Sequence, residues 1–373
     1  MRNLSKSFFF GITACLVALG AARPFLSAAD SEGVEAEGFW PHLPWDHDHP
    51  YNASIRPLVL WHGMGDSAFS ASMLEFAELC RSTHLGLFVH IIHIEDNLDK
   101  DQQAGFFGNL WDQLEVVHEQ LSNITELRNG FDALGFSQGG QFLRAYAEAY
   151  NDPPIKNLIT FGSQHMGVSD LPTCRPGDVF CQLARVAARR GVYTSYAQSH
   201  LVQAQYFRDP NQYERFLRYN NFLAVINGEV DDPETSRARN VTFKDNLEQL
   251  EELVLVMWDK DTTVVPRESS WFGSVAIPSE DERSRWGIGW GDPVEIVPMR
   301  MQPLYTNNWI GLKTLDEAGK VTLLSCAGEH MQVTRECWEP IVGKYAGSVV
   351  DVDSSKTLSN YQSQSQPKLV IQS

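Results

Sequence analysis

The stretch that most constrains this 373-residue chain is residues 135–139, Gly-Phe-Ser-Gln-Gly. The apolar residues Phe131, Ala133 and Leu134 precede it, and residues 141–147 have the spacing of a helix. Strand, sharp turn and helix in this order are the setting in which G-x-S-x-G forms a nucleophile elbow. Gly135 and Gly139 leave room for a turn that Cβ atoms would block. We therefore expect Ser137 to project above the end of a strand, with the first N–H groups of the next helix behind it.

The N-terminus has the pattern of a secretory signal peptide. Arg2 and Lys6 supply positive charge, and residues 8–19 form an apolar run that is too short to span a bilayer. Small residues at 20–22 and 27–29 predict cleavage after Ala22 or Ala29, and the sequence leaves that choice open. A short membrane anchor is the alternative. We assign residues 1–29 to the signal and residues 30–55 to a polar N-terminal lead.

Charge and ligand patterns exclude several classes of function. The net charge is −17, so the chain is a poor candidate for binding nucleic acid. After the signal, no stretch is long and apolar enough to predict a transmembrane span. His47-Asp48-His49 could hold a metal, but we interpret it as a solvated loop because no regular element is predicted there. The sequence therefore predicts no metal site, no cofactor and no obligate protein partner.

Cysteines and glycosylation sequons agree with a secreted chain. Five cysteines follow the signal, and Cys174 and Cys181 flank a turn-forming Arg-Pro-Gly, which makes them candidates for a local disulfide. Cys326 and Cys337 could form a second disulfide, leaving Cys80 as a buried thiol, but the sequence leaves this pairing open. Sequons predict surface glycosylation at three sites: Asn52, Asn123 and Asn240.

The rest of the chain alternates predicted strands and helices. Beside the elbow strand, strands are expected at 57–61, 88–94, 158–162, 253–258 and 321–324, and helices at 72–81 and 106–127. This alternation indicates a mostly parallel sheet flanked by helices. Residues of about 170–250 lack a strand pattern and are rich in aromatic residues, which predicts a largely helical cap insertion. We assign residues 56–345 to one catalytic domain and the Ser- and Gln-rich residues 346–373 to a disordered tail.

Three loops after predicted strands carry candidate catalytic residues. Strand 253–258 runs into Asp261, and strand 321–324 is followed by His330. The order Ser137, Asp261, His330 is the order of nucleophile, acid and base in the α/β-hydrolase fold. His165 follows another strand, but we interpret it as a pocket-wall residue.

An H-G-x-G turn at 62–65 follows the first predicted strand. In α/β-hydrolases a loop at this place gives one oxyanion N–H, and the residue after the nucleophile gives the second. The sequence therefore nominates the backbone N–H groups of Met64 and Gln138. The alternative is a plain strand-to-helix turn.

Segments throughout the chain resemble the lysosomal palmitoyl-protein thioesterase family, from about residue 56 to residue 342. The resemblance rests on residues 60–67, 135–140, 162–168, 201–206, 209–210, 261–266, 271–273 and 328–332. It implies an α/β-hydrolase that cleaves the thioester between long-chain fatty acyl groups and cysteine in S-acylated proteins or peptides. It also implies location in the lysosome or vacuole, although simple secretion stays open.

The resemblance implies roles for particular residues. Ser137 matches the family's nucleophile and His330 its base. The family's D-x-x-V-x-P spacing favours Asp261 over Asp259 as the acid, and Cys174 with Cys181 resembles a family disulfide. Three features depart from the family: a longer region at 283–291, a longer Ser- and Gln-rich tail, and the pair Cys326 and Cys337.

Two other functions fit parts of the sequence. A secreted lipase or carboxylesterase would use the same triad on oxygen esters, and a preference between thioester and oxygen ester of equal chain length discriminates the two. A non-catalytic lipid-binding protein on the same scaffold is the more remote alternative, because Ser, Asp and His are all present.

Overall fold

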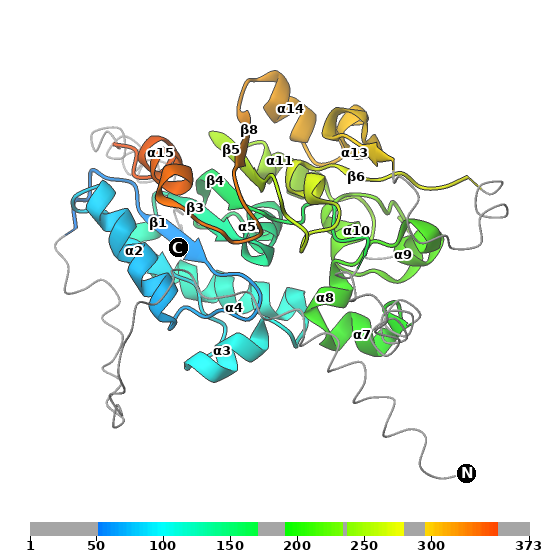
Figure 1. The fold of residues 1–373 in the computed structure, drawn as a ribbon, viewed down its shortest axis with the longest axis horizontal. Coiled ribbons are helices and arrows are strands. Elements are labelled where there is room, and N and C mark those ends of the chain that lie inside the picture. Colours follow the sequence, from blue (N-terminus) through cyan, green and yellow to red (C-terminus); the bar gives the residue numbers. More distant parts are fainter. Residues whose placement is uncertain (1–50, 171–190, 234–236, 280–294, 350–373) are drawn as a thin grey trace, which may run out of the picture.

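The computed structural model describes residues 51–170, 191–233, 237–279 and 295–349 (Figure 1). Several predictions concern residues outside these ranges. They are the signal peptide, most of the N-terminal lead with His47-Asp48-His49, the Cys174–Cys181 disulfide, the region 283–291, and the tail from residue 350.

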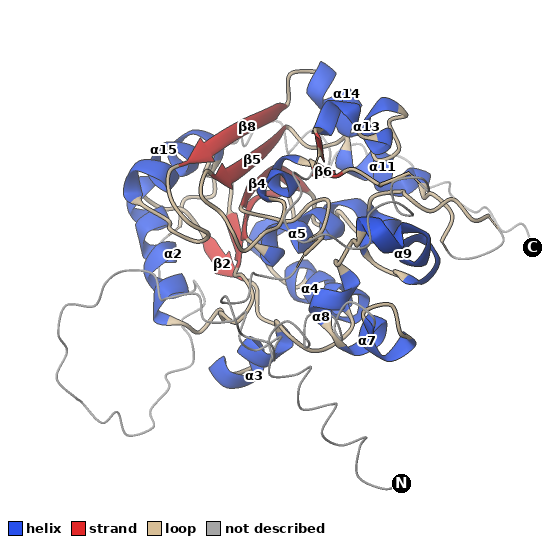
Figure 2. Ribbon diagram, turned by 45° about the vertical axis from the view of Figure 1, so that its right-hand side comes forward, coloured by secondary structure: helices blue, strands red, loops and turns tan. Residues whose placement is uncertain are grey.

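A six-stranded parallel sheet forms the centre of the fold (Figure 2). Its order is β2 (Val89–Ile91), β1 (Leu58–Trp61), β3 (Phe131–Phe136), β4 (Ile155–Phe161), β5 (Glu252–Trp258) and β8 (Val321–Cys326). Every neighbouring pair is parallel, so the carboxyl ends of all six strands meet at one edge. The inner strands are apolar and buried because helices cover both faces of the sheet. The predicted α/β-hydrolase type of fold is confirmed.

Helices lie on both faces of this sheet (Figure 1). One apolar cluster joins α4 (Leu110–Ser122) and α5 (Gln138–Ala149) to the sheet, and the other joins α2 (Ala71–Thr83) and α15 (Arg335–Tyr345). On α2 the buried residues Met73, Phe76 and Cys80 recur every three to four positions, which is the periodicity that predicted this helix. Phe76 packs edge-on against Trp338 of α15. The short helix α3 (Leu98–Ala104) follows β2.

The insertion between β4 and β5 is helical in its described residues. It holds α7 (Ser195–His200), α8 (Val202–Gln205), α9 (Tyr213–Tyr219), α10 (Leu223–Ile226), α11 (Val241–Leu247) and the 3-10 turn η3 (Pro210–Gln212). Tyr206 and Phe222 are buried and pack against Phe142 of α5. Tyr196 and Tyr219 are exposed. Tyr206 and Phe222 therefore fasten the insertion to α5.

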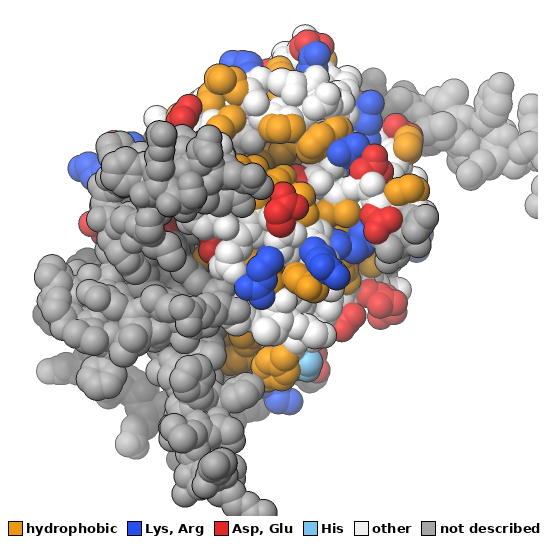
Figure 3. Space-filling model, turned by 90° about the vertical axis from the view of Figure 1, so that its right-hand side faces the viewer, with side chains coloured by type: hydrophobic (Ala, Val, Ile, Leu, Met, Phe, Trp, Pro, Cys, Tyr) orange, Lys and Arg blue, Asp and Glu red, His pale blue; other side chains and the backbone are white. Residues whose placement is uncertain are grey.

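A small second sheet and short helices lie outside the sequence predictions. Strands β6 (Ser274–Val275) and β7 (Ile296–Val297) pair antiparallel, and α13 (Pro303–Thr306) and α14 (Leu312–Glu317) follow. A hollow of about 270 Å³ lies here, lined by residues that include Met166, Arg208, Val275, Met301 and Trp309. Ser137, Asp261 and His330 are not among its lining residues. Figure 3 views this side, where hydrophobic and charged side chains intermingle.

The first and last segments of the described domain, near residues 56 and 347, lie together at the amino-terminal end of β3. Gly347 N–H donates to Asp132 Oδ2 at 3.0 Å, and Arg56 Nη1 donates to Asp132 Oδ1 at 3.1 Å. Ile55 and Val349 form an antiparallel bridge. The first residues of the predicted tail, 346–349, therefore belong to the folded domain. Within the described ranges, no helix has both the length and the apolar character needed to cross a membrane.

Candidate active site

Ser137 lies between the end of β3 and the start of α5, as the elbow motif predicts. Its backbone has φ 51° and ψ −124°, a conformation that is strained for a residue with a side chain. A Cβ added to Gly135 would overlap Gly140, and one added to Gly139 would overlap the carbonyl oxygens of Trp61 and His62. The two glycines are required because α5 begins in close contact with β3 and β1.

The structure brings Ser137, His330 and Asp261 into one chain of hydrogen bonds. His330 Nε2 lies 3.0 Å from Ser137 Oγ, and His330 Nδ1 lies 2.6 Å from Asp261 Oδ2. The side chain of Asp261 is 0% exposed and that of His330 is 8% exposed. Because a carboxylate only accepts, Nδ1 carries the proton and Nε2 accepts from the serine hydroxyl.

The two acidic residues after β5 occupy different places. Asp261 Oδ1 accepts from the N–H groups of Thr263 and Val264 at 2.8 and 3.0 Å, which leaves Oδ2 facing His330. Asp259 Oδ1 instead accepts from Gly328 N–H at 2.8 Å, on the loop that carries His330. Asp261 is therefore the acidic residue that contacts the imidazole, whereas Asp259 bonds to the backbone of the loop.

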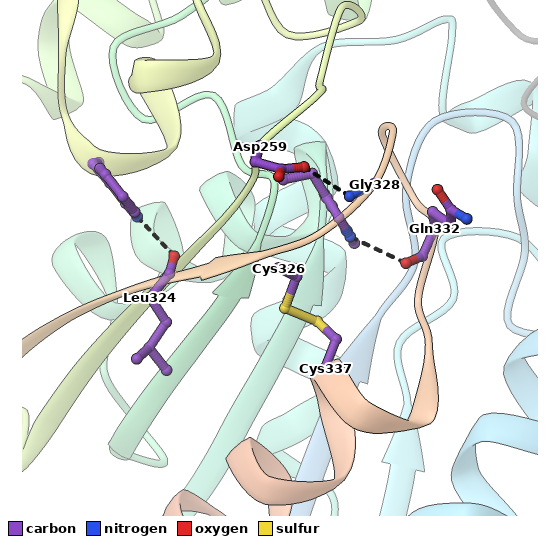
Figure 4. The surroundings of a disulfide bond; sticks show 8 residues. Asp259, Leu324, Cys326, Gly328, Gln332 and Cys337 are labelled. Atoms are coloured by element: carbon purple, nitrogen blue, oxygen red, sulfur yellow. Dashed lines mark hydrogen bonds between the residues drawn. A yellow bond between two sulfur atoms is a disulfide. The ribbon is translucent and has the colours of Figure 1, made fainter.

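The His330 loop has further support that sequence reasoning missed (Figure 4). The Trp258 ring packs edge-on against the imidazole, with centroids 5.6 Å apart, and Trp258 Nε1 donates to Gln332 O at 3.2 Å.

Cys326 and Cys337 form a disulfide across the loop, which resolves the pairing that the sequence left open. Cys80 is a free thiol, and burial raises its pKa.

The candidate oxyanion groups lie next to Ser137. A Cβ added to Gly63 would lie 3.2 Å from Ser137 Cβ, so the turn that carries Met64 packs against the elbow. Gln138 is the first residue of α5, and Ser137 makes no side-chain cap there. The leading N–H groups of α5 and the helix dipole therefore favour negative charge beside Ser137.

The insertion contacts both candidate oxyanion residues. Gln138 Nε2 donates to Gly105 O at 3.1 Å, and Tyr206 OH donates to Gln138 Oε1 at 3.2 Å. Gln203 Nε2 lies 3.1 Å from Met64 Sδ and donates to Gly105 O at 2.8 Å. Residues of α8 and its C-cap thus hold the side chains of Met64 and Gln138 in place.

A buried pair, His62 and Asp101, supports the turn that carries Met64. His62 Nε2 lies 3.3 Å from Asp101 Oδ2, which also accepts from Ser67 Oγ at 2.7 Å and Ala68 N–H at 3.0 Å. Asp101 Oδ1 accepts from Ile94 N–H at 2.8 Å. No spacing rule links His62 to Asp101, so the sequence indicated only a turn here.

This pair shifts both pKa values. Burial alone would raise the pKa of Asp101, but the bonds from His62, Ile94 and Ser67 lower it to about 2. Burial alone would lower the pKa of His62, but Asp101 raises it above the ordinary value. Both shifts favour the ion pair.

His165 does not face the site. It is fully buried, its Nε2 lies 3.0 Å from Thr160 Oγ1, and its ring stacks on Phe272. Burial lowers its pKa well below the ordinary value. Our interpretation of His165 as a pocket-wall residue is therefore wrong, because the residue belongs to the core.

The three sequon asparagines are exposed. Asn52 lies in an N-terminal turn, Asn123 caps the C-terminus of α4, and Asn240 caps the N-terminus of α11. Glycosylation at these sites stays a prediction.

Comparisons with known proteins show which family this chain belongs to. Residues 57–330 match the profile of the family described as palmitoyl protein thioesterase. Palmitoyl-protein thioesterase 1 of Caenorhabditis elegans is 38% identical over 291 residues, covering 78% of this chain and 91% of the worm protein. Lysosomal thioesterase PPT2 of Homo sapiens is 26% identical, covering 78% of this chain and 86% of the human protein.

Two further similarities involve a fusion protein and a solved structure. A thioesterase–dolichyl pyrophosphate phosphatase fusion of Schizosaccharomyces pombe is 34% identical, covering 78% of this chain and 43% of the fusion. Among solved structures, RedJ-thioesterase of Streptomyces coelicolor matches at a TM-score of 0.36 and 11% identity, covering 87% of this chain and 91% of that one. The profile match and the worm relative span most of the chain. The chain therefore belongs to the palmitoyl protein thioesterase family, as its sequence motifs predicted.

Proposed function

We propose that this protein hydrolyses the thioester between long-chain fatty acyl groups and cysteine in S-acylated proteins or peptides. The observation that carries the proposal is the hydrogen-bonded chain Ser137–His330–Asp261, found in a member of the thioesterase family. The sequence order, the strained elbow and the burial of Asp261 support the same roles.

In the proposed first step, Ser137 Oγ attacks the thioester carbonyl carbon. His330 Nε2 takes the serine proton, and Asp261 stabilises the imidazolium that forms. The C–S bond then breaks, and the cysteine sulfur leaves with the proton that His330 returns. The products of this step are an acyl ester on Ser137 and a free cysteine thiol.

In the proposed second step, water attacks the acyl ester while His330 takes its proton. Ser137 Oγ leaves and recovers that proton, which releases the fatty acid. The backbone N–H groups of Met64 and Gln138 would hold the oxyanion in both steps. Losing one such donor typically costs about 10²–10³ in rate.

The substrate proposal has an energetic basis. Each buried CH₂ group contributes about 0.8 kcal/mol, so a long acyl chain supplies most of its own binding free energy wherever it meets an apolar wall. We propose that the insertion forms part of that wall as a cap, because Tyr206 and Gln203 already contact residues beside Ser137.

We also propose that the protein works in the secretory pathway, in the lysosome or vacuole or outside the cell. The Cys326–Cys337 disulfide supports an oxidising route of synthesis. The N-terminal pattern, the exposed sequons and relatives named as lysosomal thioesterases support the same route.

The deciding experiment compares release of thiol from a palmitoyl-cysteine peptide with hydrolysis of a palmitate oxygen ester. We expect wild type to favour the thioester, and we expect Ser137→Ala to lose turnover while its circular dichroism and thermal midpoint stay near those of wild type. Cleavage of the oxygen ester alone would move the protein to the lipase class. Full turnover by Ser137→Ala would remove Ser137 from the mechanism.

A further inference from the structure

The loop that carries His330 is covalently closed at its base. Cys326 is the last residue of β8, Cys337 lies in the first turn of α15, and their disulfide spans a sequence separation of 11 (Figure 4). His330 lies between them, near the middle of the closed loop.

The outgoing half of this loop is fastened to the loop that carries Asp261. Asp259 N–H donates to Cys326 O at 3.0 Å, and Lys260 N–H donates to Gly328 O at 3.0 Å. Asp259 Oδ1 accepts from Gly328 N–H at 2.8 Å. Up to Gly328, the backbone therefore follows the end of β5.

The return half is fastened differently. Its hydrogen bonds include two inside the loop, from Gln332 N–H to Glu329 O and from Val333 N–H to Met331 O, and one from Trp258 Nε1 to Gln332 O. Met331 and Val333 are only partly buried against the core. The disulfide adds a covalent tie where this half of the loop reaches α15.

The second cysteine of the disulfide, Cys337, lies on a helix that is firmly packed. Trp338 and Ile341 of α15 are buried in the same apolar cluster as Phe76 of α2. Cys326 and Cys337 are themselves only 6% and 9% exposed. The disulfide thus connects the end of β8, an edge strand of the sheet, to a helix that is packed in the apolar cluster between the sheet and α2.

We propose that the Cys326–Cys337 disulfide positions His330 for catalysis. The inference rests on the proposed role of His330 as the base. His330 must keep two partners in line at once, Asp261 at 2.6 Å and Ser137 at 3.0 Å. A misplacement of about 1 Å in such an arrangement can cost about 10²-fold in rate. Because the base serves both acylation and deacylation, loss of positioning lowers kcat and leaves KM nearly unchanged.

The test is the double variant Cys326→Ala/Cys337→Ala beside the matched control Cys80→Ala. Cys80 is a buried cysteine of the same apolar cluster but belongs to no disulfide, so its loss removes a sulfur without removing a cross-link. The readouts are kcat and KM on a palmitoyl-cysteine peptide, and the rate at which a fluorophosphonate labels Ser137. The labelling rate reports the Ser–His geometry without needing the acyl substrate.

We expect kcat and the labelling rate of the double variant to fall about 10-fold or more, with KM within about twofold of wild type. Cys80→Ala should keep both rates near wild type. If the double variant keeps wild-type rates and loses only thermal stability, the disulfide is a structural cross-link and the proposal is wrong. A raised KM with unchanged kcat would also overturn it.

If the double variant does not fold, a second measurement tests the same proposal on folded protein. Folded protein carrying Cys174→Ala/Cys181→Ala is treated with a phosphine reductant, and opening of Cys326–Cys337 is followed by alkylation and mass spectrometry. Activity should fall in proportion to opening and return on reoxidation; full activity with the bond open would refute the positioning role. The Ser137→Ala variant tests the proposed mechanism separately from the role of the disulfide. Turnover by that variant would show that the proposed triad is wrong, whatever the disulfide variants do.

Discussion

At the scale of single residues, Asp261, His330 and the Met64 turn are each held in place by neighbouring groups. Asp261 is fixed by two backbone N–H groups, His330 by the Trp258 ring, and the Met64 turn by the buried Asp101. The sequence predicted Ser137, Asp261 and His330 because each follows a recognisable strand. It could not predict Asp101, Asp259 or Trp258 in their supporting roles, because those depend on contacts between distant segments.

The Asp101–His62 pair predicts a pH-dependent stability. The pKa of His62 is raised above 6.5, so its contribution is complete below pH 6.5 and is lost as pH rises through the folded-state pKa. The pKa of Asp101 is lowered from 3.8 to about 2, so its contribution is present above pH 3.8 and is lost as pH falls towards 2. Together they contribute most between about pH 4 and 6.5.

We therefore expect Asp101→Asn to lower the free energy of unfolding by about 3 kcal/mol in that window, because it leaves His62 charged and buried without its partner. The loss should shrink at pH 8. Urea titrations at pH 5 and pH 8 measure the difference. Asp99→Asn is the control, since it makes the same charge change at an exposed position of α3. An equal loss at both pH values would contradict the pair's role.

At the scale of elements, the site depends on how closely α5 approaches the ends of β3 and β1. Gly139 permits that approach, because a Cβ there would overlap the carbonyl oxygens of Trp61 and His62. The turn that follows those carbonyls carries Met64. The position of the candidate oxyanion groups is thus linked to the packing of one helix against one strand.

Gly139→Ala should therefore lower kcat even in protein that remains folded. The new methyl group pushes the 61–64 turn away from α5, and the oxyanion donors move with it, so we expect a loss of about 10²-fold in kcat. Gly343→Ala in α15 is the control. A Cβ at Gly343 has only Thr83 Cγ2 nearby, at 3.8 Å, and alanine in a helix is favoured by about 0.5–1 kcal/mol. If both variants keep wild-type kcat, the helix–strand contact does not position the donors.

Sequence patterns predicted the long elements better than the short ones. The six sheet strands were predicted because each overlaps a mostly apolar run, and helices α2, α4 and α5 were predicted because their apolar residues have helical spacing. Strands β6 and β7 have two residues each, too few to show any alternation. Helix α15 was missed because Pro340 and Gly343 interrupt its pattern, although Trp338, Ile341 and Val342 bury one face of it. Tertiary packing decided these elements.

At the scale of the whole molecule, the first and last described segments are joined at the amino-terminal edge of the sheet, opposite the edge that carries the site. Asp132, near the start of β3, accepts from Arg56 at one limit of the domain and from Gly347 at the other. Asn157 Nδ2 of β4 donates to Tyr345 O at 2.9 Å beside them. Segments from both limits of the domain are thus joined under the centre of the sheet.

Asp132→Ala should destabilise the fold without touching the chemistry. It leaves the Gly347 N–H without its acceptor and Arg56 with only Glu251, so we expect a loss of about 2 kcal/mol. Five residue-to-residue steps of about 3.3 Å each separate it from Ser137, so kcat of the folded fraction should match wild type. Thermal midpoint and kcat measured on one preparation test both parts. A large fall in kcat at a temperature where the variant is fully folded would refute this separation.

The sheet order has a consequence for how the enzyme loses function. The proposed nucleophile, Ser137, follows the interior strand β3, whereas the proposed base, His330, follows β8, the last strand in the order, whose residues are mostly only half-buried. Amide protons of β8 should therefore exchange with solvent through partial openings that leave β3 protected. Each such opening would separate His330 from Ser137 and would then close again. Inactivation on warming would then begin as a reversible fraying at one margin of the molecule, well before the protein as a whole unfolds.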